Sequence, residues 1–290
     1  MFATPALTHF LFTYRLGKQI RQDPATPVYS RLHQAKEGTP TMGGILVWGT
    51  AVFLAVAFGL LDLAFPGAGV ASKLNFLSRS QTLLPLGVMV ASALIGLGDD
   101  LLGVFRIGPK GGGLTMKHRL ALYTIIAIVG AWWFYAKLER DIIHVPFFGN
   151  FAVGAWFMLF AAFVVVATAF STNEADGLDG LAGGVMLIAY AALGAIAFKH
   201  GLYDLAAFTG VVMGASLAFL WFNIYPARFF MGDTGAMSLG VTAGVIALLT
   251  NAAFLLPLIM FIPFIESGSV IVQALSKRLA GRKIFISTPI

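Results

Sequence analysis

The sequence contains no cysteine and little charge. Without cysteine the chain forms no disulfide, offers no thiolate to a metal and has no cysteine nucleophile. Charged residues make up only 11% of the chain, whereas a soluble domain carries about a quarter. Hydrophobic residues make up 58%. These proportions exclude an ordinary soluble domain and predict a polytopic membrane protein.

The apolar residues form long continuous runs that lack the period-2 alternation of a β-barrel, so helices are expected. We predict an all-α fold, a polytopic helical bundle that forms a single transmembrane domain over residues 1–290. Several runs fall short of the roughly 20 residues that a spanning helix needs, and a ninth, residues 2–12, is only half that length. The eight runs expected to span the membrane are 43–62, 82–97, 120–135, 152–170, 178–198, 205–224, 237–250 and 254–275.

The basic residues orient the predicted bundle. One side of the spans holds all Lys and Arg residues except Lys73, Arg79, Lys137, Arg140 and Lys199. The positive-inside rule assigns that basic side to the cytoplasm. The net charge of +6 therefore reflects topology, and no nucleic-acid partner is expected.

A polar segment, residues 173–180, interrupts two apolar runs. Acids near membrane spans are costly and are functional candidates by default. If this turn is helical, Asn173, Asp176 and Asp179 lie on one side, because they recur at every third position. Oxygen ligands of this kind suit Mg²⁺. A solvated polar loop with turn-forming glycines is the alternative.

Further acids lie at the same predicted membrane face. Asp99 and Asp100 close the second span, and Asp233 lies between two glycines before another span. The paired acids suit a general base or a metal partner, whereas a solvated helix end is the simpler reading. Asp233 alone could be a helix N-cap. Acids from three separate loops thus converge on one side, which unrelated solvated loops do not explain.

Two other segments on this face are candidates for phosphate binding. Residues 36–44, Lys-Glu-Gly-Thr-Pro-Thr-Met-Gly-Gly, place backbone N–H groups and hydroxyls at a helix start, where they could hold a phosphate or a uracil edge. A glycine-rich loop carries Arg106, Lys110, Lys117 and Arg119. Ordinary helix capping and the positive-inside bias explain these features equally well.

Together these blocks resemble the polyprenyl-phosphate N-acetylhexosamine-1-phosphate transferase superfamily, glycosyltransferase family 4. The blocks that match in order and placement are 38–44, Asp99-Asp100, Asn173-x-x-Asp176-Gly177-x-Asp179-Gly180 and Phe230-Met231-Gly232-Asp233. The first block is similar to that of the phospho-N-acetylmuramoyl-pentapeptide transferases. The set spans most of the chain and is specific only in combination.

The resemblance implies a Mg²⁺-dependent phosphoryl transfer in bacterial peptidoglycan synthesis. Undecaprenyl phosphate would attack UDP-N-acetylmuramoyl-pentapeptide and give lipid I and UMP, by direct attack rather than through an aspartyl intermediate. The site would face the cytoplasm from the bacterial plasma membrane. Members of the family often pair in the membrane, so a homodimer is one expectation, and the sequence leaves the oligomeric state open.

The resemblance also implies roles for individual residues. Asn173 and Asp233 would hold Mg²⁺, and Asp99, as base, and Asp100 would lie near the lipid phosphate. Lys117 would neutralise phosphate charge. The catalytic set is then Asp99, Asp100, Asp176 and Asp233. The nucleotide pocket would be lined by Lys36, Thr41, Asp176, Gly177, Leu178, Asp179, Asn223 and Phe230.

The sequence departs from the family pattern at Gly103, where a lysine is usual, so Arg106 is a candidate substitute. Family members also have a full first span, a His-rich loop and a last helix, and we expect the chain to be a fragment that lacks them. One alternative function is the sister enzyme that transfers N-acetylglucosamine 1-phosphate. A transporter or a lipid-binding protein is the other, although transporters place their charges at the membrane midplane.

Overall fold

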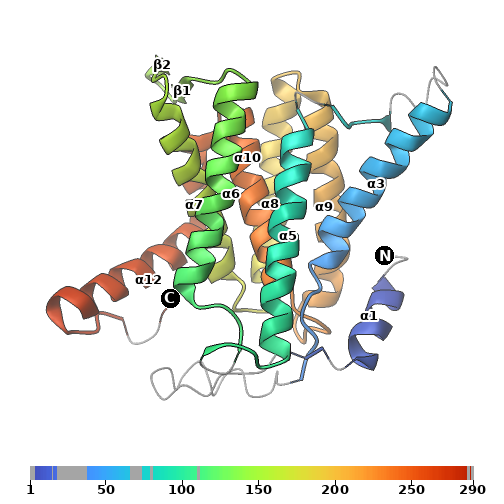
Figure 1. The fold of residues 1–290 in the computed structure, drawn as a ribbon, viewed down its shortest axis with the longest axis vertical. Coiled ribbons are helices and arrows are strands. Elements are labelled where there is room, and N and C mark those ends of the chain that lie inside the picture. The colour runs from blue at the N-terminus through green and yellow to red at the C-terminus, as the bar shows by residue number, and fades with distance from the viewer. Residues whose placement is uncertain are drawn as a thin grey trace.

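The computed structural model describes residues 4–14, 16–17, 38–65, 74–78, 81–109, 112–285 and 288. Within these ranges the chain is a bundle of long apolar helices with one small hairpin, as Figure 1 shows. Seven described helices are long and apolar enough to cross a membrane. The prediction of an all-α, multi-pass membrane protein is confirmed.

The helices follow one another through the bundle in alternating directions (Figure 1). The seven candidate spans are α3 (Ile45–Ala64), α5 (Leu83–Val104), α6 (Met116–Lys137), α7 (Trp156–Ala175), α8 (Leu181–Lys199), α9 (Tyr203–Asn223) and α10 (Gly232–Leu249). The remaining elements are α1 (Thr4–Thr13), β1 (Ile142–Val145), β2 (Gly149–Ala152), η3 (Ala253–Leu255), α11 (Leu256–Ile259) and α12 (Phe261–Ala280).

Alternating directions give the bundle two ends. The loop segments 105–109, 112–115, 176–180 and 224–231 lie at one end, called the site end below. The opposite end carries the antiparallel hairpin of β1 and β2, in which Ile142 pairs with Ala152 and Val145 with Gly149. The acids of the sequence motifs all fall at or near the site end, because each lies where a helix enters or leaves these loops.

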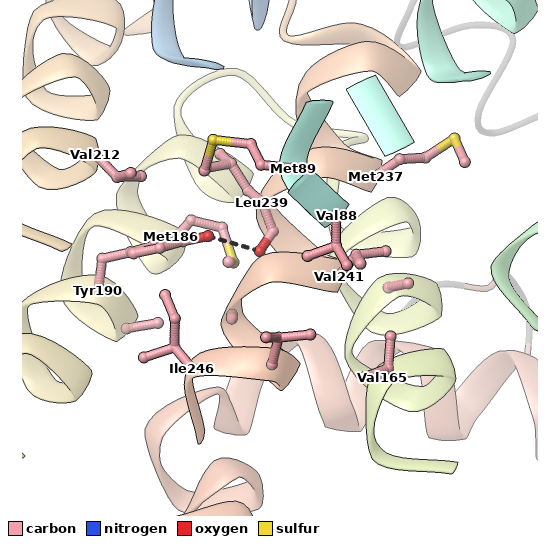
Figure 2. Packing of buried hydrophobic residues seen from close by; sticks show 14 of the residues in the cluster. Val88, Met89, Val165, Met186, Tyr190, Val212, Met237, Leu239, Val241 and Ile246 are labelled. Atoms are coloured by element: carbon pink, nitrogen blue, oxygen red, sulfur yellow. Dashed lines mark hydrogen bonds between the residues drawn. The ribbon is translucent and has the colours of Figure 1, made fainter. Parts of the chain in front are cut away.

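The core of the bundle is α10. Every residue of this helix is buried except Asp233, so it is surrounded by protein on all sides. It packs mainly against α5 and α7. In the close-up of Figure 2, Tyr190 on α8 also reaches α10, and its hydroxyl donates to the carbonyl of Leu239 at 2.9 Å. That bond satisfies a polar atom that would otherwise be costly to bury.

Small residues let α10 approach its neighbours closely, as is common between membrane helices. Gly96 on α5 is the clearest case. A Cβ at this position would lie 2.5 Å from the backbone carbonyl carbon of Asp233 and 2.6 Å from the amide nitrogen of Thr234. Only glycine therefore allows α5 to touch the first turn of α10, where the acid of the later motif lies.

The last predicted span, 254–275, differs from the structure. The segment breaks at Met260, and the short helical pieces over 253–259 meet α12 at an angle of 89°. The pair counts as one span only if a bent segment is accepted, which gives up to eight spans among the described residues. The half-length first run corresponds to α1, with ten residues. In Figure 1, α12 points away from the rest of the bundle.

Candidate active site

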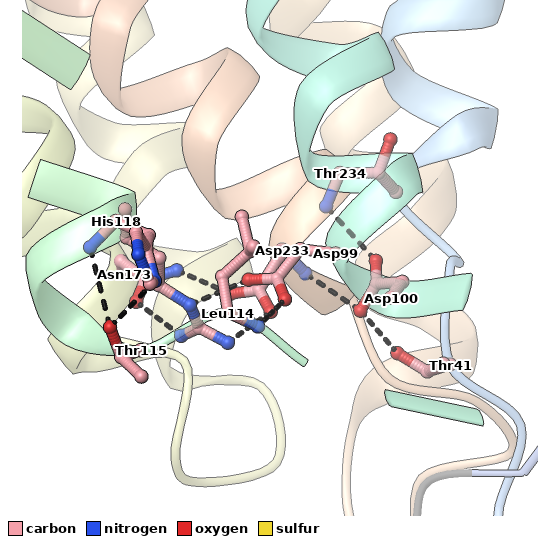
Figure 3. A network of polar contacts seen from close by, with 10 residues as sticks. Thr41, Asp99, Asp100, Leu114, Thr115, His118, Asn173, Asp233 and Thr234 are labelled. Atoms are coloured by element: carbon pink, nitrogen blue, oxygen red, sulfur yellow. Dashed lines mark hydrogen bonds and ion pairs between the residues drawn. The ribbon is translucent and has the colours of Figure 1, made fainter. Parts of the chain in front are cut away.

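The centre of the site is the guanidinium of Arg119, on the first turns of α6. Its Nε lies 2.6 Å from Oδ2 of Asp99, and one terminal nitrogen lies 2.8 Å from Oδ2 of Asp233. The other terminal nitrogen donates to Oδ1 of Asn173 at 3.3 Å. Figure 3 shows Asp99, Asn173 and Asp233 converging from α5, α7 and α10. Three oxygens from distant parts of the chain thus face one cation.

The second oxygen of each carboxylate in this cluster also has a partner. The amide of Asn173 donates to Oδ1 of Asp233 at 2.6 Å, and the backbone N–H of Leu114 donates to Oδ1 of Asp99 at 2.6 Å. Asp99 has no exposed side-chain surface, whereas Asp233 keeps 18% and Arg119 keeps 20%. The cluster is therefore held rigidly from within and is open at Arg119 and Asp233.

Asp100 lies beside this cluster and makes a different set of contacts. Its two oxygens accept the backbone N–H groups of Asp233 at 3.1 Å and Thr234 at 3.0 Å, and Thr41 donates to it at 3.3 Å. The first N–H groups of a helix lack partners within it, and a carboxylate is favoured there. The N-cap of α10 is Met231, whose side chain makes no cap bond, so Asp100 supplies the cap from α5.

The glycine- and threonine-rich block pairs with the segment before α10. The N–H of Phe230 donates to the carbonyl of Pro40 at 2.8 Å, and the N–H of Gly43 donates to the carbonyl of Phe230 at 2.8 Å. The N–H of Gly44 continues the pairing by donating to Met231 at 2.9 Å. Thr41 is buried with its hydroxyl on Asp100. The described part of this block therefore holds the segment that leads into α10 and contacts Asp100. Lys36 lies outside the described residues.

The loop from 176 to 180 is a turn and not a continuation of α7. The helix ends at Ala175, so the helical arrangement expected for Asn173, Asp176 and Asp179 is wrong beyond Asn173. Gly180 adopts a left-handed φ of +77°, which favours glycine and ends the turn. The chain therefore leaves the helix before Asp176, so Asp176 and Asp179 do not share a helix face with Asn173.

This turn is tied to the loop after α9. Oδ2 of Asp179 accepts the N–H of Ala227 at 3.2 Å, and buried Asn223 accepts the N–H of Gly180 at 3.0 Å and donates to the carbonyl of Phe229 at 2.9 Å. Leu178 is 57% exposed at the surface of the turn. The predicted nucleotide-pocket residues of both loops are thus neighbours. Asp176 and Gly177 lie half-buried between Ala175 and Leu178.

Two functional features were missed or misplaced from the sequence. Arg119 is the cation that contacts the acids. Lys117, two positions earlier, is exposed, and so is Arg106. A helix start at Thr115, whose hydroxyl accepts the N–H of His118, was the available signal, since it places residue 119 one turn into a helix beside the acids. That capping bond fixes the first turn of α6.

Glu266, which the sequence could not place, is buried on α12. One of its carboxylate oxygens is enclosed and has no hydrogen-bond partner among the described residues. The neighbouring Ser267 bonds Ser171 on α7, oxygen to oxygen, at 2.8 Å. Glu174, one turn after Ser171, is close enough for the charges of the two glutamates to interact. Glu174 follows Asn173 in the chain and is close enough for its charge to interact with Arg119 and Asp233 as well.

The oxygens around Arg119 fit a hard divalent cation. Two carboxylates and an amide oxygen are the ligands that Mg²⁺ takes, and it keeps several waters in addition. Within the described ranges, no three His, Cys, Asp or Glu residues are grouped as ligands. The fit therefore depends on the amide oxygen of Asn173 together with carboxylates.

Comparisons with known proteins find similarity to one family of transferases. The family model described as glycosyl transferase family 4 matches residues 82–251. The phospho-N-acetylmuramoyl-pentapeptide-transferase signature 1 matches residues 36–46, the block that lies under the site.

Relatives of that name extend the match along the chain. The phospho-N-acetylmuramoyl-pentapeptide-transferase of Chloroflexus aggregans is 37% identical over 272 residues, which are 91% of this chain and 68% of that protein. The enzymes of Anoxybacillus flavithermus and Bacillus subtilis are 33% and 34% identical, and each match covers 99% of this chain and 83% of the relative. The chain therefore belongs to glycosyl transferase family 4 and is a membrane-spanning transferase.

Proposed function

We propose that the chain transfers phospho-N-acetylmuramoyl-pentapeptide from its UDP conjugate to undecaprenyl phosphate and releases UMP. The observation that carries this proposal is the convergence of Asp99, Asn173 and Asp233 on Arg119 at one end of a membrane bundle. A lipid phosphate and a cytosolic nucleotide can meet only at such an end. The signature block beside Asp100 favours the N-acetylmuramoyl-pentapeptide substrate.

In this reaction an oxygen of the lipid phosphate forms a bond to the β-phosphorus of the nucleotide. The bond between that phosphorus and the bridging oxygen breaks, and the oxygen leaves with UMP. Asp99 is placed to accept the proton of a protonated lipid phosphate, since its Oδ2 faces the cluster and its Oδ1 is held by Leu114. Arg119 supplies positive charge for the phosphates. The loops with Asp179 and Asn223 would hold the uridine.

Mg²⁺ would be held by Asn173 and Asp233, with Asp99 beside them. When bound, it would neutralise charge that develops on the phosphate oxygens. The basic residues at the site end support a cytoplasmic site in a bacterial plasma membrane, because positive residues collect on that side. A homodimer remains part of the proposal.

The test is a transfer assay on the purified chain in detergent, with undecaprenyl phosphate and one UDP-sugar at a time. We expect lipid I and UMP from UDP-N-acetylmuramoyl-pentapeptide with Mg²⁺, and loss of both products with EDTA. A lipid product from UDP-N-acetylglucosamine alone would identify the sister enzyme. The matched variant is Asp233→Asn. If this variant releases UMP as fast as the wild type, the metal assignment is contradicted.

A further inference from the structure

Arg119 uses the oxygens that we assign to the metal. Its three nitrogens contact Oδ2 of Asp99, Oδ2 of Asp233 and Oδ1 of Asn173. The other carboxylate oxygens are engaged by Leu114 and by the amide of Asn173. A divalent cation held by Asn173 and Asp233, with Asp99 beside them, would therefore need oxygens that the guanidinium already contacts, and the two positive groups would compete for them.

The position of Arg119 gives the displaced side chain somewhere to go. The residue is on the first turns of α6, directly after the loop of the site end, and 20% of its side chain is exposed. Asp99 has no exposed side-chain surface, whereas Arg119 and Asp233 are partly exposed, so a released guanidinium would turn toward the exposed side of the cluster. A planar fork of N–H donors matches two phosphate oxygens at once, and it stays charged at any working pH.

We propose that the Arg119 guanidinium switches between two sets of oxygens. Mg²⁺ would take over the carboxylate and amide oxygens that Arg119 contacts, and the freed guanidinium would bind the diphosphate of the nucleotide. This inference rests on the proposed function, because it takes a nucleoside diphosphate as the ligand. Binding of the metal then raises the affinity for the diphosphate, because each ligand favours the position of the Arg119 side chain that the other needs. By thermodynamic linkage the effect is reciprocal.

The experiment measures the affinity of the full chain for Mn²⁺, by the paramagnetic resonance signal of the free ion, with and without UDP. UDP and the metal would also attract each other directly in every variant, so only a difference in coupling between variants reports the exchange. The informative variant is Arg119→Gln, which keeps the length and removes the charge. Arg140→Gln is the matched control, because Arg140 lies at the opposite end and bonds a single side-chain oxygen, of Asn251, at 3.5 Å.

Without UDP we expect Arg119→Gln to bind Mn²⁺ about tenfold more tightly than the wild type, since the internal competitor is gone. UDP should raise the Mn²⁺ affinity of the wild type by a factor about tenfold larger than in Arg119→Gln. Arg140→Gln should match the wild type in both measurements. Arg119→Lys keeps the charge but loses the fork, so its coupling should be intermediate, and it carries the test if Arg119→Gln does not fold.

Equal coupling in the wild type and Arg119→Gln would overturn the exchange and leave the proposed function intact. An equal change in Arg140→Gln would also overturn it, because the effect would then follow net charge alone. A wild-type chain that binds Mn²⁺ but not UDP would overturn the exchange and the proposed function together.

Discussion

Asp99 and Asp100 are neighbours in the chain, yet they belong to two different regions of the site. Asp100 faces backbone N–H groups and a buried threonine, and it fixes the start of α10. Asp99 faces the charged side chain of Arg119 at the open cluster. One carboxylate completes the fold, and the other remains in the part of the site that can exchange partners. Adjacent acids in a motif therefore need separate explanations.

The largest effect on activity is expected from Asp99→Asn. The amide keeps the acceptor for Leu114 but removes the base and one charge facing Arg119. We expect UMP release to fall about 10²- to 10⁴-fold, the usual contribution of a general base. The melting temperature, followed by tryptophan fluorescence in detergent, should fall less than in Asp100→Asn, because Arg119, although it then faces one NH₂ group, keeps Asp233 and Asn173 as partners and is 20% exposed. A melting temperature that falls as far as that of Asp100→Asn would show that Asp99, like Asp100, mainly stabilises the fold.

The same substitution at Asp100 should affect stability more, and UMP release less, than the substitution at Asp99. Asp100→Asn leaves one of the two N–H groups of α10 facing an NH₂ group, and an unpaired buried donor costs about 1–3 kcal/mol. We expect a clearly lower melting temperature and a smaller loss of UMP release than in Asp99→Asn. Wild-type stability with full loss of activity would show that Asp100 acts chemically and would break the comparison.

Gly232→Ala tests the Asp100 region without removing a charge. Gly232 has φ of +74°, and a Cβ there would lie 2.5 Å from Oδ2 of Asp100. The left-handed conformation alone costs an alanine about 1 kcal/mol, so the melting temperature should fall. Gly184→Ala is the control, because nothing lies within 4 Å of its Cβ position in the first turn of α8. It should leave stability unchanged or raise it, and equal losses in both variants would exclude crowding at Asp100.

The smallest effect is expected from Glu266→Gln, which lies outside both regions. The change removes a buried charge that has an enclosed oxygen without a described partner and that lies near Glu174. A buried unpaired charge is costly, so the melting temperature should stay the same or rise. UMP release should change by about twofold or less. A large loss of activity would extend the site onto α12.

The fold class and the common end of the bundle where the motif acids lie were predictable because their signals are local. Apolar runs of helical length indicate spans, and acids at span ends indicate a shared face. The division of labour between Asp99 and Asp100 was not predictable, because it depends on which helix start lies beside each residue. Arg119 was named only as one of several basic residues of its loop, because its sequence neighbours Lys117 and Lys110 carry the same charge.

The bend before α12 was also beyond the sequence. Hydropathy measures length and composition, and residues 254–275 satisfy both as a single span. The change of direction by 89° depends on how the pieces pack against their neighbours. The roles assigned to the predicted substrate-binding residues remain predictions: Asp176, Gly177, Leu178, Asp179, Asn223, Phe230 and Lys117. The magnesium site is also a prediction, which the EDTA and Asp233→Asn assays test.

The cap that α5 provides for α10 links catalysis to biogenesis. A ribosome releases α5 into the bilayer long before α10 has been synthesised, since Asp100 and Thr234 are 134 positions apart. Until α10 arrives, the acids of α5 have neither the N–H groups nor Asp233 as companions. A nascent chain therefore cannot assemble a working centre early, and the insertion of α10 is the event that completes it.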